Sequence, residues 1–201
     1  KENPDLYIGI ELEFPIVHTK GQPTDIEVSK DLMHFLVDAL SLEVEKVDQE
    51  GNPIQLVEPA SQDRILFEVS YTTLEFAFGR AQNIQEVEGR FQAYMKVIQE
   101  KLGEKNHAIQ GLGIHPNWNQ NDNRPVAYPR YQMLMDYLSM GSHQESAHLH
   151  DFPQYGAFIC GSQVQLDVST ANYLSVINAF TQIEAAKAYL FANSEFSGAD
   201  W

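Results

Sequence analysis

The chain has 201 residues, of which 43% are hydrophobic and 11% aromatic, a composition typical of a globular domain and not of a disordered segment. Lysine and arginine total 13 against 28 aspartate and glutamate residues, so the formal net charge is −15. Such a chain repels the phosphate backbone of nucleic acids, so we expect no nucleic-acid partner. The acidic excess either attracts divalent cations or only keeps the surface well solvated.

No apolar run is long enough to cross a bilayer, and the N-terminus carries no signal-peptide pattern. We therefore expect no membrane partner and a soluble, cytoplasmic protein. The single cysteine, Cys160, excludes an internal disulfide and fits a reducing compartment. Within AFICGSQV it is expected to be a small buried residue and not a nucleophile.

Hydrophobic periodicity predicts the helices and strands of the first half of the chain. It begins with a strand over residues 6–17 and a helix over 29–40 that has Ser29 as its N-cap. Further along, the pattern predicts short strands at 42–47 and 53–57, a strand pair at 65–70 and 73–78, and a long helix over 83–103.

The second half of the chain also mixes predicted strands and helices. The pattern predicts a strand at 107–113, a polar loop at 116–125, a helix at 128–140, a loop at 141–153, a strand at 156–168 and a long helix at 170–193. His143, His148 and His150 fall in the second loop, where His-x-His without a cysteine partner is a weak zinc motif. The element order predicts one α+β domain over residues 1–201 with a largely antiparallel sheet, and not a doubly wound fold.

The first strand reads GIELEF and carries glutamates at alternate positions. Because side chains in a strand change face at every residue, Glu11 and Glu13 share one face while Ile10, Leu12 and Phe14 share the other. Taken alone, this pattern is typical of an antiparallel strand with one solvated face.

The stretch LFEVSYTTLEF predicts a second acidic pair. A two-residue loop at Tyr71 and Thr72 would place Glu68 directly opposite Glu75 on the neighbouring strand. Two opposed carboxylates are destabilising unless a cation lies between them. Tyr-Thr is a poor tight turn, however, so a longer connection with two exposed glutamates is the alternative.

In CGSQVQLDVS, Gln163, Gln165 and Asp167 alternate with apolar residues, so they share one face of a third strand. Amide oxygens are hard neutral ligands that complete a Mg²⁺ shell or orient a substrate. If the three strands are neighbours in one sheet, their polar faces form one acidic surface that needs a divalent cation. An all-oxygen donor set suits Mg²⁺ or Mn²⁺ better than Zn²⁺, and carboxylate-bound Mg²⁺ commonly also binds nucleotide phosphates.

Five segments in the same order resemble motifs of the glutamate-cysteine ligase superfamily. GIELEF resembles the family's G-x-E-x-E opening strand, FEVSYTTLEF its F-E-L-S-x-x-x-L-E segment, and ICGSQVQLDVS its T-x-Q-V-N-L-D-F strand. PRYQMLMDYL is similar to the helix start G-R-Y-x-x-M, and FANSEFSG to A-N-S-P-F. The matches extend from Gly9 to Gly198, which makes the set far more specific than any one motif.

The resemblance implies a glutamine-synthetase-like fold, with a curved antiparallel sheet and helices on its outer face. It implies ATP-dependent joining of the γ-carboxylate of L-glutamate to the amine of L-cysteine through a γ-glutamyl phosphate, the first step of glutathione synthesis. Carried over by motif, Glu11, Glu13, Glu68 and Glu75 are the catalytic carboxylates and, with Gln163, the Mg²⁺ ligands.

Four further residues are expected to contact substrate: Gln165 beside the metal ligands, Arg130 and Tyr131 at the helix start, and Trp118 in the HPNWN loop. The family pattern extends well beyond the A-N-S segment, so the resemblance also implies that this chain is the N-terminal portion of a larger catalytic domain. Three alternatives stay open: a relative that uses another amine, a non-catalytic module that binds metal or amino acid, and a metal-dependent hydrolase.

Overall fold

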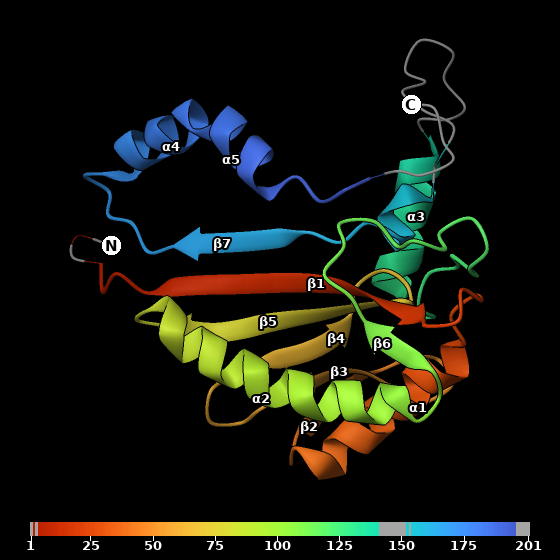
Figure 1. The fold of residues 1–201 in the computed structure, drawn as a ribbon. Coiled ribbons are helices and arrows are strands. Elements are labelled where there is room, and N and C mark those ends of the chain that lie inside the picture. Colours follow the sequence, from red (N-terminus) through yellow and green to blue (C-terminus); the bar gives the residue numbers. More distant parts are fainter. Residues whose placement is uncertain (1, 3, 141–151, 153, 196–201) are drawn as a thin grey trace.

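The computed structural model describes residues 2, 4–140, 152 and 154–195. Within these residues the chain forms one seven-stranded sheet in which every paired strand is antiparallel (Figure 1). The strands are β1 (Ile8–His18), β2 (Glu43–Val47), β3 (Pro53–Val57), β4 (Arg64–Phe67), β5 (Thr73–Ala81), β6 (His107–Ile109) and β7 (Ser162–Leu166). The helices are α1 (Ile26–Ala39), α2 (Ile84–Gly103), α3 (Pro129–Met140), α4 (Tyr173–Gln182) and α5 (Glu184–Phe191).

The sheet order is β2-β3-β4-β5-β1-β6, and β7 also pairs with β1. β1 therefore pairs with three strands: β5 lies along one side, and β6 and β7 pair with different parts of the other side. The mixture of helices with an antiparallel sheet confirms the predicted α+β class.

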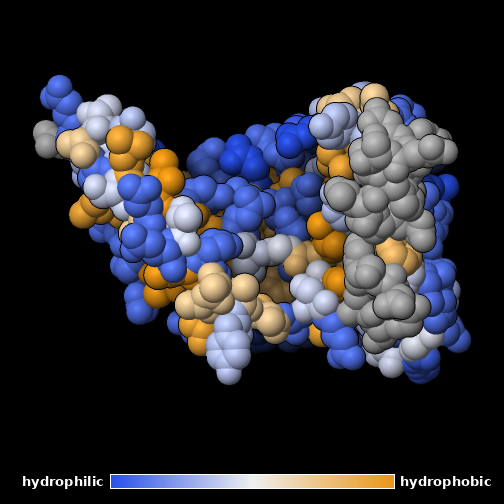
Figure 2. All heavy atoms as spheres, turned by 90° about the horizontal axis from the view of Figure 1, so that it is seen from above, coloured by the Kyte–Doolittle hydropathy of each residue, from blue (hydrophilic) through white to orange (hydrophobic). Residues whose placement is uncertain are grey.

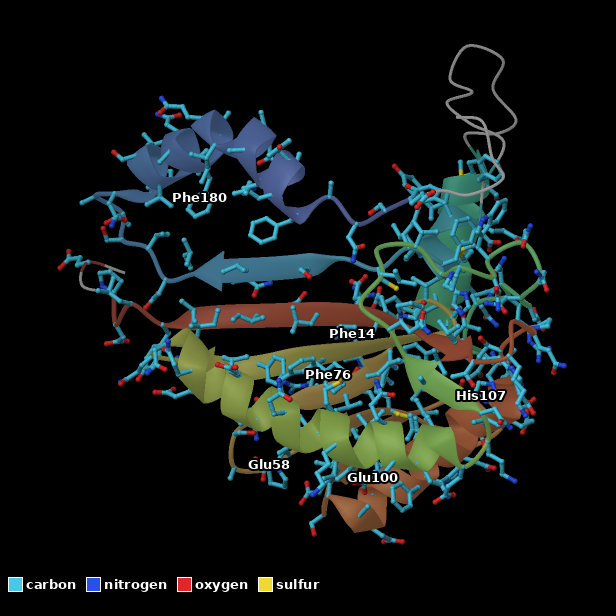
Figure 3. The ribbon with its side chains drawn as sticks, viewed as in Figure 1. Phe14, Glu58, Phe76, Glu100, His107 and Phe180 are labelled. Carbon is cyan, nitrogen blue, oxygen red and sulfur yellow. The ribbon has the colours of Figure 1, made fainter. Side chains whose placement is uncertain are left out.

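One face of the sheet is covered by α1 and α2, and the main core lies beneath them (Figure 1). Phe14 of β1 and Phe76 of β5 pack edge to face with ring centroids 5.8 Å apart, and both rings contact Phe91 of α2 (Figure 3). This packing uses the apolar face of β1, so it leaves the opposite, glutamate-bearing face away from the helices, as the alternation predicted.

Beyond β7, α4 and α5 form a separate layer whose apolar side chains are largely exposed. Seen from above, these side chains gather over α4 and α5 at the left of Figure 2. Leu174, Ile177, Leu190 and Phe191 are all more than half exposed, and Phe180 points from α4 toward β7 (Figure 3). None of the helices in the described part of the chain combines the length and apolar character that a membrane span requires.

The predicted start of the first helix is wrong. The first helix begins at Ile26, and its N-cap is Asp25, whose carboxylate accepts the backbone N–H of Glu27, whereas Ser29 is buried inside the helix. An acidic N-cap satisfies the free N–H groups as well as serine does, so the earlier residue caps the helix. The long helix, in contrast, begins at Ile84 after an Asn83 N-cap and ends at Gly103, as predicted.

The predicted hairpin register is also wrong. Leu66, not Glu68, lies opposite Glu75, because β4 ends at Phe67 and the connection spans residues 68–72. The pairing is thus shifted by two residues from the tight-turn register, as expected where Tyr-Thr cannot form that turn. A shift of two preserves the face of every side chain, so Glu68 still shares a face with Glu75.

Three predicted elements after residue 105 are too long. The 107–113 strand ends at Ile109, and the 156–168 strand becomes a 3₁₀ turn at Tyr155–Ala157 followed by β7. The 170–193 helix is divided at Ile183, near Thr181, whose hydroxyl donates to the carbonyl of Ile177, a local bond that commonly bends helices. His143, His148 and His150 lie outside the described residues.

Candidate active site

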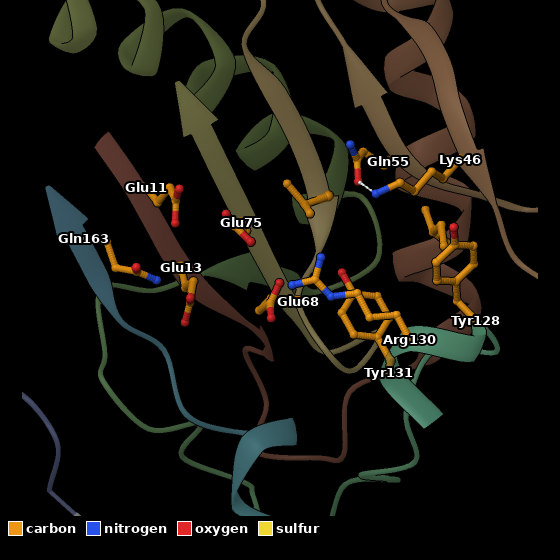
Figure 4. Close-up of a pocket in the computed structure, with 12 residues that line it drawn as sticks. Glu11, Glu13, Lys46, Gln55, Glu68, Glu75, Tyr128, Arg130, Tyr131 and Gln163 are labelled. Carbon is orange, nitrogen blue, oxygen red and sulfur yellow. Dashed lines mark hydrogen bonds between the residues drawn. The ribbon is translucent and has the colours of Figure 1, made fainter. Parts of the chain in front are cut away.

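The registers of β1 bring acidic and amide side chains from three strands together. Glu13 lies directly opposite Glu75 of β5, and Glu11 lies directly opposite Gln163 of β7. All four point to the sheet face that α1 and α2 leave open (Figure 4). The sequence alone could not specify this, because it does not state which strands are neighbours.

Glu68 is positioned by a strained turn at the end of β4. Val69 has a φ of 61°, a conformation rarely adopted by β-branched residues, and the Glu68 carbonyl accepts the N–H of Ser70. The backbone on either side is held by the segment around α3. The Tyr131 hydroxyl donates to the carbonyl of Phe67 at 2.8 Å, and Val126 N–H donates to that of Val69 at 2.7 Å. The strain is therefore offset by contacts that orient Glu68 toward the open face.

These side chains line a cavity of about 350 Å³. Glu11, Glu13, Glu68 and Glu75, here called the carboxylate cluster, lie at one end (Figure 4). Lys46 and Tyr128 line the other end, Gln163 lies beside Glu11, and Arg130 reaches from α3 toward Glu68. The remaining lining residues are Ile54, Gln55, Leu66 and Tyr131. The cavity thus holds carboxylates from β1, β5 and the β4–β5 connection and cations from β2 and α3.

The electrostatics of the carboxylate cluster reflect burial and mutual repulsion. Burial, a hydrogen bond with Glu68 and the charges of Glu68, Glu11 and Glu13 together raise the pKa of Glu75 to about 9, and burial is the largest cause. The pKa of Glu13 is also raised, mainly by burial, although the N–H of Gly161 bonds its carboxylate at 2.6 Å. Without a cation, Glu75 therefore retains its proton near neutral pH.

Such a cluster fits a divalent cation. Among the described residues, no three acidic, histidine or cysteine side chains are already gathered around one point as metal ligands. The donors are nevertheless carboxylate and amide oxygens, which suit Mg²⁺ or Mn²⁺. Burial is the main cause of the raised pKa values of Glu13 and Glu75, and repulsion between carboxylates adds to it. A cation between the two groups would offset that repulsion, so the charge and the donor chemistry both match the expected metal.

Gln165 lies next to this cluster on β7. Its Nε2 donates to Oε1 of Glu11 at 3.1 Å, and it lies opposite Gly9 of β1. A Cβ on Gly9 would be 2.8 Å from the Gln165 Oε1, so glycine leaves the space in which that amide reaches Glu11. This contact explains why a glycine opens the GIELEF motif.

The other residues expected to contact substrate are divided between two places. Arg130 lines the cavity and extends toward Glu68 (Figure 4). Tyr131 is buried and its hydroxyl donates to the Phe67 carbonyl, so only its ring is left to contact a ligand in the cavity. Trp118 does not line this cavity. It packs on Phe158 with ring centroids 5.3 Å apart and borders a second cavity of about 620 Å³.

Sequence reasoning missed Lys46 and Gln55, which line the cavity at the end opposite the carboxylate cluster. Lys46 and Gln55 lie on the two strands farthest from β1 along the sheet, and neither belongs to a motif. The excess of acidic residues was the indication that the sequence offered. In such a chain, a lysine that forms no ion pair is a candidate for binding an anionic ligand.

An antiparallel sheet that carries carboxylates on one open face, with cations in the same cavity, has the donor groups to bind a divalent cation together with an anionic ligand. The chain matches the family model for glutamate-cysteine ligase family 2 (GCS2) over residues 7–200, and it belongs to that family. This membership indicates an ATP-dependent carboxylate–amine ligase that acts on small molecules. A comparison with curated proteins gives no match.

Proposed function

We propose that this protein is a glutamate-cysteine ligase, which joins the γ-carboxylate of L-glutamate to the amine of L-cysteine in the first step of glutathione synthesis. The observation that carries the proposal is the opposition of Glu13 and Glu75, with Glu11 and Glu68 beside them in one cavity. Family membership supplies the reaction class, and the carboxylate cluster supplies a place for the metal that such a reaction uses.

In the proposed reaction, the terminal phosphoryl group of ATP is transferred to the γ-carboxylate and ADP leaves. The cysteine amine then attacks the acyl phosphate, forms the C–N bond and expels inorganic phosphate. Bound Mg²⁺, or Mn²⁺, neutralises phosphate charge during this transfer.

The chain's own residues bind and orient the reactants. We propose Glu11, Glu13, Glu68, Glu75 and Gln163 as the metal-holding set. Gln165 orients Glu11 through the hydrogen bond that Gly9 permits. Arg130 binds substrate anions, because a guanidinium matches the geometry of carboxylates and phosphates. We propose that Tyr131 shapes this cavity with its ring and that Trp118 contacts substrate from the second cavity, which it borders.

We also propose that the chain is the N-terminal portion of a larger, glutamine-synthetase-like catalytic domain with a curved sheet, located in the cytoplasm. The exposed apolar side chains of α4 and α5 support the first part, because further chain packed on them would remove a large apolar area from water. The single cysteine suits a reducing compartment.

The direct test is phosphate release from ATP by the full-length protein, with and without each amino acid. Release that requires glutamate, cysteine and Mg²⁺ together, with γ-glutamylcysteine as the product, is the expected result. Turnover with another amine but none with cysteine would identify a different γ-glutamyl ligase. Phosphoester hydrolysis without an amine would indicate a hydrolase.

Calorimetry tests the proposed metal ligands. We expect Glu11→Gln and Glu68→Gln to weaken Mg²⁺ and Mg²⁺-nucleotide binding, whereas Glu100→Gln on α2, far from the cavity, should not (Figure 3). Unchanged binding in the first two variants would contradict the ligand assignment.

A further inference from the structure

Lys46 of β2 occupies the end of the cavity opposite the carboxylate cluster. It belongs to a row of residues that lie directly opposite one another across five strands. In order, the row contains Lys46, Gln55, Leu66, Glu75 and Glu13. Directly opposed residues in a sheet share a face, so the row runs from a cation to two carboxylates along the floor of one cavity.

A β-bulge places Lys46 in this row. Val44 lies opposite Leu56, but the next pair is Lys46 with Gln55, so Glu45 is an extra residue in β2. In a regular ladder Glu45 alone would lie opposite Gln55, and Lys46 would point to the other face. Bulges of this kind redirect a side chain and are common beside active sites.

Among the described residues Lys46 forms no ion pair, although the pKa of Glu45 is lowered chiefly by Arg64 and to a smaller extent by the charge of Lys46. Its Nζ donates to Oε1 of Gln55 at 2.8 Å and lies 6.0 Å from the centre of the Tyr128 ring (Figure 4). The adjacent Glu45 is instead engaged by Arg64, which donates to both of its carboxylate oxygens at 2.8 and 3.0 Å.

Within the described part of the chain, neither Lys46 nor Arg130 forms an ion pair. Two cations that form no ion pair within the described residues, in one cavity, are unexpected in a chain of net charge −15, where acids are abundant. An ammonium and a guanidinium held in this way are suited to an anionic group on a ligand.

We propose that Lys46 binds the second carboxylate of the acyl-donor amino acid, the one that does not react. This inference rests on the proposed function, since it assigns a specificity residue to that site. The reacting carboxylate and the phosphate must meet at the carboxylate cluster and its metal. The other carboxylate is repelled by the cluster and is directed along the row toward Lys46, whose backbone is roughly 14 Å from that of Glu75, three strand spacings away.

The test measures binding of L-glutamate and of its α-carboxamide analogue by calorimetry, with Mg²⁺ present, on the full-length protein. The amide removes only the charge that Lys46 is proposed to bind. Wild type should prefer glutamate, and Lys46→Met should weaken glutamate binding about 10- to 100-fold while leaving the amide almost unchanged. Lys46→Arg should restore most of the preference, and Lys96→Met, on an exposed position of α2, should behave as wild type.

Loss of the preference in Lys46→Met alone supports the assignment even if no ligase turnover is found, in which case only the proposed function fails. A preference unchanged in Lys46→Met overturns the assignment, as does the absence of any preference in wild type. ATP binding is measured in the same way, in the presence of glutamate or of the amide. If Lys46→Met weakens ATP binding equally in both cases, the assignment is also overturned, because Lys46 would then bind phosphate. Thermal unfolding of each variant verifies that the sheet is intact.

Discussion

Glu13 and Glu75 lie directly opposite each other on β1 and β5, in a cavity that Glu11 and Glu68 also line. Opposed carboxylates destabilise a sheet, and Glu75 is only 7% exposed, so water screens the repulsion poorly. The metal-free sheet therefore keeps Glu75 protonated near neutral pH, at a place where a bound cation would favour the ionised carboxylate. Four predictions follow from this arrangement and its supports.

The first concerns pH. Because burial and Glu68 raise the pKa of Glu75 to about 9, the folded protein holds this proton where the unfolded chain, with the ordinary value of 4.5, has lost it. The resulting stability is fully present below the unfolded pKa and is lost as the pH rises through the folded one. The free energy of unfolding of the metal-free protein should thus fall by up to about 1.4 kcal/mol per pH unit across this window.

Thermal unfolding in a chelator, at several pH values between about 5 and 8, measures this slope. Glu75→Gln should flatten it, and Glu100→Gln, exposed on α2, should not. Added Mg²⁺ should stabilise the protein more at the higher pH, because it binds the ionised carboxylates. A slope that is the same in Glu75→Gln would show that other groups cause it.

The second prediction concerns Tyr131. Its hydroxyl donates to the Phe67 carbonyl at the start of the turn that orients Glu68. Tyr131→Phe leaves that carbonyl without this donor, and we expect a loss of about 1–2 kcal/mol in unfolding free energy together with weaker Mg²⁺ binding. Tyr137→Phe is the matched control, since Tyr137 lies on the same helix and is 68% exposed. Equal effects in the two variants would contradict the positioning role.

The third prediction concerns Gly9. Gly9→Ala places a Cβ 2.8 Å from the Gln165 Oε1, the end of a flexible side chain that can rotate away from Glu11. Stability should change by less than about 1 kcal/mol, while Mg²⁺ binding weakens. In a Gln165→Ala background the same substitution should have little further effect on binding. Additive effects of the two substitutions would mean that Gly9 acts by another route.

The fourth prediction tests the fold around β5. A Cβ on Gly79 would be 1.9 Å from the backbone oxygen of Ser61, which no side-chain rotation relieves. Gly79→Ala should therefore cost about 3 kcal/mol of unfolding free energy. Gly89 of α2 has open space around its Cβ position, so Gly89→Ala should stabilise the protein by about 0.5–1 kcal/mol. Denaturant unfolding compares the two, and a mild effect at Gly79 would contradict the close approach.

Much of the fold could be predicted because local patterns specify it. The alternation in β1 and the Asn83 cap and Gly103 end of α2 are properties of neighbouring residues, and the structure has all of them. The division of the last helix at Ile183 and the short extent of β7 could not be predicted. In both, the apolar periodicity continues past the point where the backbone hydrogen bonds change.

The residues of the candidate site also divide into those that the sequence predicted and those that it did not. The carboxylates and amides of the motifs were found from the sequence, and so was their shared face, since a register shift of two residues leaves the face unchanged. Lys46 was not found, because its position depends on a bulge that shifts β2 against β3. Trp118 was grouped with the substrate residues, yet it borders a different cavity.

By itself, then, the sequence determined the family, through its ordered motifs. It also determined which side chains of β1, β5 and β7 share a face, because the alternation of side chains is a property of each strand alone. Only the tertiary structure decided that Glu13 meets Glu75, that Glu11 meets Gln163 and that Lys46 faces them from the other end. Those relationships arise from strand order and register, which are set by long-range packing of the apolar face against α1 and α2.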